Sequence, residues 1–190
     1  MSLEKKNSFR DAYEQFEMSI MTQFEVLFSK SLDAVKSSYK TKEDTQITFT
    51  GQELTPLMIA TCNSSPEVIK YIASLGADLN AKDKEGFTAV HWAANNHDAE
   101  TIKILAELGA DLNMFDSVGE LTPLGVSLEM SRHDSVKALV NAGADLLITN
   151  SKGESPINYI LSRPNYEKLY HYILPTIKFT LEYKSWINQV

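Results

Sequence analysis

The triplet Gly-Ala-Asp occurs three times in this chain, and its spacing constrains the fold more than any other feature. The copies stand at 76–78, 109–111 and 143–145, so they are 33 and then 34 residues apart. A second series of Thr or Ser residues, at 55, 88, 122 and 155, runs in step with them at spacings of 33, 34 and 33. Such an internal repeat predicts a solenoid of stacked units.

Each copy carries the signals of two helices. Thr or Ser followed by Pro is typical of a helix start, because the hydroxyl accepts a bond from a free backbone N–H and Pro loses none there. An apolar run at helical spacing, a polar break and a second apolar run follow. Gly76, Gly109 and Gly143 then end the second helix, since Gly adopts the left-handed conformation at little cost. A turn leads to the next copy.

The copy GFTAVHWAANNHD, which continues to LGADLN at 108–113, resembles an ankyrin repeat, and so do its neighbours. The resemblance covers copies at 51–83, 84–116, 117–150 and 151–174. It implies an all-α ankyrin-repeat solenoid, in which fingers project at right angles to stacked helix pairs. The fourth copy has no Gly-Ala-Asp, and its second helix is predicted to run into Pro175. Residues 175–190 are predicted to form a separate C-terminal capping helix.

The copies depart from the family's pattern at two positions. Only the second copy keeps the motif's His, as His91, which the resemblance implies is structural and ties its helix to neighbouring backbone. The other copies have Met58, Gly125 and Asn158 there. The 34-residue step also places one extra residue between Asp116 and Thr122. We expect that loop to bulge at its tip, toward solvent.

The first 50 residues differ in kind from the repeats. Apolar residues, many of them Phe, recur at steps of three and four, and no Gly or Pro occurs between residues 2 and 50. An amphipathic helical segment is therefore predicted over about 8–38, with a possible break at 29–31 where Ser31 would cap a short second helix. We interpret residues 1–50 as a cap and linker ending in an imperfect first finger. The alternative is a structural homo-oligomer assembled through this helix.

Charge and cysteine content narrow the class of partner. The net charge is −7, and residues 51–190 carry 17 acidic and 11 basic side chains. This balance argues against nucleic acid, whose phosphates need clustered Lys and Arg. No run reaches the ~18 apolar residues of a membrane span, so no membrane is expected. The single cysteine, Cys62, favours a reducing compartment and therefore a cytoplasmic location. The resemblance to ankyrin repeats implies one such setting, that of a bacterial effector delivered into a host cell.

No motif in the sequence indicates catalysis. A Gly-rich phosphate loop and a Cys/His set with metal-ligand spacing are both missing from the sequence, and the four His residues lie in three different copies. We therefore expect no enzymatic activity, no cofactor, no metal and no small-molecule substrate.

The resemblance implies that another protein binds along the finger tips and the first helices, on a concave face. Fingers are normally polar turns, yet apolar residues gather here in the second and third, and exposed apolar clusters mark interaction sites. The predicted site consists of Phe87, Met114, Phe115, Val118, Leu121, Lys84, Glu85, Asn95, Asn96, Glu129 and Met130. We expect a non-catalytic adaptor, scaffold or inhibitory binder whose partner the sequence does not name.

Overall fold

The structure is a computed structural model that describes residues 26–27, 31–49, 51–63, 65–163 and 166–187. Over these residues the regular elements are helices and one isolated β-bridge, which confirms the all-α class. None of the described helices is both long and apolar enough to cross a lipid bilayer. Most of the helix predicted over 8–38 lies outside the described residues, and so does the choice between a cap and an oligomerisation helix.

The chain divides into two compact units, and the first is Met1–Asp78. Its described elements are α2 (Leu32–Ser38), the 3-10 helix η1 (Glu43–Gln46), α3 (Pro56–Cys62) and α4 (Pro66–Ser74). α3 and α4 form a helix pair, and α2 packs against α4. Ser31 caps α2 as predicted, because its hydroxyl accepts the Ala34 N–H at 3.3 Å.

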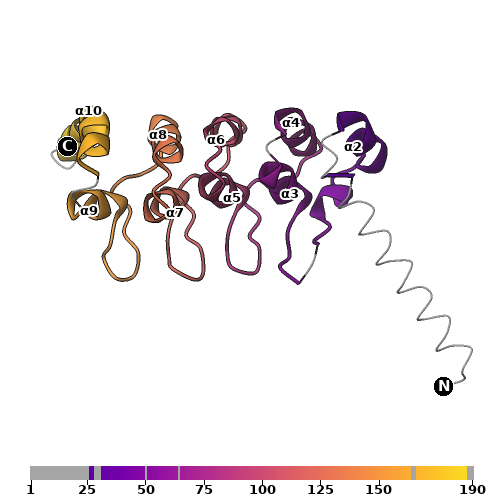
Figure 1. Cartoon of the computed structure of the whole chain (residues 1–190), viewed down its shortest axis with the longest axis horizontal. Helices are drawn as coiled ribbons and strands as arrows, with labels where there is room; N and C mark the ends of the chain where they lie inside the picture. The colour runs from indigo at the N-terminus through magenta and orange to yellow at the C-terminus, as the bar shows by residue number, and fades with distance from the viewer. Residues whose placement is uncertain (1–25, 28–30, 50, 64, 164–165, 188–190) are drawn as a thin grey trace, which may run out of the picture. The chain divides into compact units, whose positions relative to one another are not determined.

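The second unit, Leu79–Val190, holds three helix pairs. They are α5 (Ala89–Asn95) with α6 (Ala99–Glu107), α7 (Pro123–Glu129) with α8 (His133–Asn141), and α9 (Pro156–Leu161) with α10 (Glu167–Ile187). Within this unit α5, α7 and α9 form one row and α6, α8 and α10 a second, while long loops project from the first row (Figure 1). Neighbouring helices of each row pack together, as a repeat solenoid requires.

The helix signals that were seen in the sequence form the expected caps. At the start of three first helices the hydroxyls of Thr55, Thr122 and Ser155 accept the backbone N–H groups of Met58, Gly125 and Asn158, respectively, at 3.2–3.3 Å. Asp98 caps α6 by accepting the Thr101 N–H at 3.0 Å. Gly109 and Gly143 end α6 and α8 with φ of +94° each. Buried aliphatic side chains between the rows, such as Leu105 and Leu139, contribute about 1.5–3 kcal/mol apiece.

Two asparagines, each at the start of a finger loop, connect one repeat to the next. The Asn80 side-chain oxygen accepts the Asp111 N–H at 2.8 Å, and Asn113 accepts the Asp145 N–H at the same distance. The next equivalent position is Leu147, and the copy that follows has no Gly-Ala-Asp to supply the N–H. The series of bonds therefore ends where the repeats end.

The C-terminal segment differs from the prediction of two helices divided at Pro175. α10 is one helix of 21 residues with Pro175 inside it. A proline within a helix removes one hydrogen bond and crowds the carbonyl four residues earlier. Ile173 and Ile177 on either side of it are buried, and α10 packs against α8 and α9. This packing outweighs the local cost of the proline, so the boundary predicted between residues 174 and 175 is wrong.

A finger precedes each first helix and is closed near its tip by a backbone hydrogen bond. We name these the first (49–54), second (83–87), third (116–121) and fourth (150–154) fingers, each by the two residues that this bond joins. In the last three, the opening Asp or Asn side chain accepts further N–H groups of the tip, as Asp83 does from Glu85 and Phe87 at 2.9 Å. The third finger has one residue more between Gly119 and Thr122 than the second has between Gly86 and Thr88. This extra residue is Glu120, which adopts a left-handed φ of +52°.

Candidate functional site

A groove of about 430 Å³ lies on the finger side of the second unit, between the third and fourth fingers and the helices α7 and α9. Its apolar lining comes from Phe115, Leu121, Ile148, Pro156 and Tyr159. Its charged lining comes from Glu120, Glu129, Glu154 and Arg163. An apolar floor with a few charged groups is the usual composition of a binding site.

The extra residue of the third finger, Glu120, reaches the fourth finger beside this groove. The Glu120 carboxylate accepts the Ser151 N–H at 2.9 Å and also the Ser151 hydroxyl. These hydrogen bonds hold the pKa of Glu120 below its usual value. The loop was expected to bulge toward solvent at its tip, where Val118 is 74% exposed, and the Glu120 side chain in addition links the third finger to the fourth.

The floor of the groove is open because α7 has Gly125 where α5 has His91. A Cβ at residue 125 would lie 3.3 Å from two carbons of Leu121, so the glycine leaves room for the Leu121 side chain. Gly125 itself lines the groove. A larger side chain at residue 125 would displace Leu121 or fill the space.

His91 occupies the same position one repeat earlier and performs the structural role that was predicted. Its ring is fully buried, and Nδ1 accepts the Thr88 N–H at 3.1 Å. Since Nδ1 is the acceptor, the proton is on Nε2, which donates to the Leu121 carbonyl at 3.2 Å. Burial lowers the pKa of His91 to about 4, so the ring is neutral at pH 7.

The second and third fingers approach each other more closely than the third and fourth do. The Ser117 N–H donates to the Glu85 carbonyl at 2.8 Å, and Lys82 Nζ donates to the Phe115 carbonyl at 2.8 Å. A Cβ on Gly86 would lie only 2.6 Å from the Ser117 nitrogen. Backbone therefore occupies the space that is open between the third and fourth fingers.

An aromatic–cation pair forms one end of the groove. The Arg163 guanidinium lies over the Tyr159 ring, 4.0 Å from its centroid, and Tyr159 contacts Tyr166 edge to face at 5.8 Å. Burial raises the pKa of Tyr159, whereas the positive charge of Arg163 lowers it. Arg163 is exposed, so this stacking contributes about 0.5–1 kcal/mol.

The repeat motif has a counterpart among known families. A family model described as ankyrin repeats (3 copies) matches residues 24–116. Residues 24–116 of the chain are ankyrin repeats. The match begins at residue 24, within residues 1–50, which we interpreted from the sequence as a cap and linker. Ankyrin repeats generally mediate protein–protein interaction and are generally non-catalytic.

Two curated relatives match more weakly. SMC5-SMC6 complex localization factor protein 1 of Bos taurus is 28% identical over 110 residues, which is 57% of this chain and 10% of that protein. The protein of the same name in Homo sapiens is 29% identical over 119 residues, or 61% of this chain and 11% of its own length. The chain thus spans about a tenth of the length of these relatives.

The structure brings together three of the eleven residues predicted for the binding site. Phe115, Leu121 and Glu129 line the groove. The others lie outside its lining: Lys84, Glu85, Asn96, Val118 and Met130 are exposed, and Phe87, Met114 and Asn95 are half-buried. Phe87 stacks on His91 with ring centroids 5.4 Å apart and meets Trp92 edge to face at 6.2 Å. Its ring therefore packs within its own ankyrin repeat.

Sequence reasoning missed several groove residues, above all Tyr159 and Gly125. Tyr159 and Arg163 are four residues apart where a helix ends, a spacing that brings side chains together and could have indicated their stacking. Gly125 was noticed as a departure from the motif, but its effect depends on Leu121 and on the fourth finger. The fourth finger begins 25 residues after Gly125, and a contact over such a separation is not visible in a local sequence pattern.

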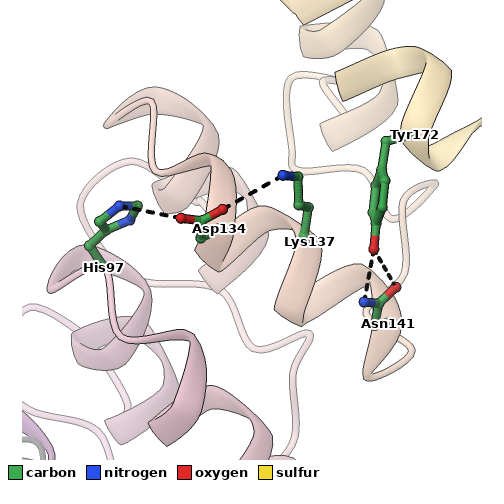
Figure 2. Close-up of polar contacts among 5 residues, drawn as sticks. All are labelled: His97, Asp134, Lys137, Asn141 and Tyr172. Atoms are coloured by element: carbon green, nitrogen blue, oxygen red, sulfur yellow. Dashed lines mark hydrogen bonds and ion pairs between the residues drawn. The ribbon is translucent and has the colours of Figure 1, made fainter. Parts of the chain in front are cut away.

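The opposite side of the second unit, formed by the second helices, carries a row of polar contacts (Figure 2). Asp134 lies 3.9 Å from His97 and 3.6 Å from Lys137, while Tyr172 exchanges hydrogen bonds with Asn141. The charged members are 43–66% exposed. Exposed pairs contribute about 0–1 kcal/mol, so we assign them to the surface rather than to a site. No metal-binding group of three or more His, Cys, Asp or Glu occurs among the described residues.

Proposed function

We propose that the chain is a non-catalytic binding module that holds a partner protein in the groove between its third and fourth fingers. The observation that carries the proposal is the groove itself, with an apolar floor of Phe115, Leu121 and Tyr159 inside a charged rim. Aromatic side chains in such positions supply much of the free energy of binding. The family's general role in protein interaction supports this proposal.

The proposal extends to an adaptor that brings a bound protein to a place in the cell. Its support is that both relatives are named as localization factors of a complex. The single cysteine favours a reducing compartment, so we place this adaptor in the cytoplasm.

The test is the replacement Phe115→Ala in the full chain. A partner is first captured from an extract of the source cells, and its Kd is then measured with purified proteins. Loss of the ring should weaken binding at least about tenfold, or about 1.4 kcal/mol. Because Phe115 is half-buried at the groove, folding stability should fall by under about 1 kcal/mol.

Val118→Ala is the matched control, because Val118 lies three residues after Phe115, in the third finger, is 74% exposed and does not line the groove. It should leave the Kd unchanged. The proposal is wrong if Phe115→Ala folds normally and binds the partner as tightly as the unmodified chain. A large drop in melting temperature for Phe115→Ala would instead show that the ring stabilises the stack.

A further inference from the structure

Charged side chains at the groove indicate the chemistry of the segment that binds there. Three carboxylates, on Glu120, Glu129 and Glu154, stand against the single guanidinium of Arg163. The hydrogen bonds from Ser151, and to a smaller extent the charge of Lys152, lower the pKa of Glu120. Even when the positive charge of Lys152 is counted, the net charge of these groove side chains is negative.

Glu129 is the carboxylate that is open to a partner. Glu120 is bonded to Ser151, and Glu154 accepts from the Asn150 side chain at 3.0 Å. The Glu129 carboxylate is exposed at the last residue of α7, and its charge acts on Tyr159. This carboxylate makes no hydrogen bond or ion pair with the residues that the structure describes. A carboxylate beside an apolar surface attracts a cationic group and repels phosphate.

The dimensions of the groove suit a short segment rather than a folded surface. Its volume of about 430 Å³ lies between two fingers, over the rings of Phe115 and Tyr159 and the side chain of Leu121. Asn158 lines the same groove and is exposed. Its amide offers both a donor and an acceptor, which an extended peptide backbone can use.

We infer that the groove takes a short extended segment of a partner protein in which a Lys or Arg stands next to an apolar side chain. The apolar side chain lies over Phe115, Leu121 and Tyr159, and the cation pairs with Glu129. Arg163 remains on the Tyr159 ring. This inference rests on the proposed function and adds the chemistry of the ligand.

The test uses the full chain as bait for a phage library of random 12-residue peptides. Selected peptides should be enriched in Lys or Arg within two positions of Phe, Leu, Ile or Met. One such peptide is then synthesised, and its Kd is measured by fluorescence anisotropy at low and high salt. Charge reversal in Glu129→Lys should weaken binding at least about tenfold, and added salt should weaken binding to the unmodified chain.

Glu107→Lys is the matched control. Glu107 is also exposed at the last residue of its helix, α6, and it does not line the groove, so its reversal should leave the Kd unchanged. If circular dichroism shows that Glu129→Lys is poorly folded, Glu129→Gln replaces it, because this change removes the charge at nearly constant side-chain volume. We expect the peptide to bind Glu129→Gln at least about threefold more weakly than the unmodified chain.

The outcomes separate the inference from the proposed function. Peptides that lose affinity in Phe115→Ala but show no preference for Lys or Arg, or that bind folded Glu129→Lys and Glu129→Gln unchanged, overturn the inferred chemistry and leave the groove as the binding site. If no peptide is selected, or if selected peptides bind Phe115→Ala unchanged, the inference and the groove as a peptide site are both overturned.

Discussion

Two neighbouring pairs of fingers in the second unit are built from the same motif but joined in different ways. Between the second and third fingers, the Ser117 N–H is bonded to the backbone carbonyl of Glu85 at 2.8 Å. Between the third and fourth, the equivalent N–H of Ser151 is bonded to the carboxylate of Glu120 at 2.9 Å. Backbone contact closes the first pair, whereas one side chain spans the second.

The first helices α5 and α7 also differ in whether a side chain reaches the neighbouring repeat. His91 of α5 reaches across to the Leu121 carbonyl at 3.2 Å, whereas Gly125 of α7 has no side chain with which to reach the fourth finger. One inserted residue and one glycine therefore separate a packed pair of fingers from an open one. A repeat protein can form a binding groove by weakening one contact between repeats while the helices of both rows stay packed.

The largest effect expected from this comparison is the dependence of stability on pH through His91. Its pKa is about 4 in the folded chain and near 6.5 in the unfolded chain. Above pH 6.5 neither the folded nor the unfolded chain binds a proton at His91, so His91 causes no loss of unfolding free energy there. As the pH falls from 6.5 to 4 the unfolded chain gains the proton first, so the free energy of unfolding drops by up to about 3 kcal/mol.

Carboxylates titrate in the same range, so the measurement is a difference between two proteins. His91→Asn is the matched variant, because the fourth repeat has Asn158 at this position. Urea unfolding at several pH values should show the unmodified chain more stable at pH 7, with its advantage shrinking below pH 6.5. An advantage that is constant from pH 7 to pH 4 would mean that the His91 ring is not buried as neutral imidazole.

A smaller effect is expected where the second finger touches the third. At Gly86 φ is +83°, and an added Cβ would meet the Ser117 nitrogen at 2.6 Å. Gly86→Ala should therefore lower the free energy of unfolding by about 2 kcal/mol. Gly153 has a similar φ of +74° but nothing within 4 Å of its Cβ position, so Gly153→Ala should cost about 1 kcal/mol from the backbone alone. Equal losses, measured by chemical unfolding, would show that the close approach does not matter.

The repeat and its helix caps could be predicted because their signals are local. The Thr122 hydroxyl bonds an N–H three residues away, and Gly109 ends its helix through its own φ. Pro175 misled the prediction for the opposite reason, since burial of Ile173 and Ile177 depends on helices elsewhere in the sequence. Local rules give the cost of a proline in a helix but not the packing that offsets it.

The candidate site was predicted only in part. Phe115, Leu121 and Glu129 follow from their place in the repeat, and the extra residue of the third finger is visible as a 34-residue step. The direction of the Glu120 side chain is not visible, because its partner Ser151 lies 31 residues away. Phe87 looked like an exposed aromatic but packs on His91, a contact that depends on the buried position of that ring.

The smallest expected effect is confined to one backbone N–H and tests the bridge between the third and fourth fingers directly. In Glu120→Ala the Ser151 N–H loses its acceptor, while the Ser117 N–H keeps the carbonyl of Glu85. Amide hydrogen exchange by NMR should become at least about tenfold faster at Ser151 and stay unchanged at Ser117, with little change in melting temperature, because such a bond opens locally. The Ser117 amide is thus an internal control within one sample. Faster exchange at both amides would show that the two pairs of fingers open together, and the contrast between a backbone contact and a side-chain bridge would then have no energetic meaning.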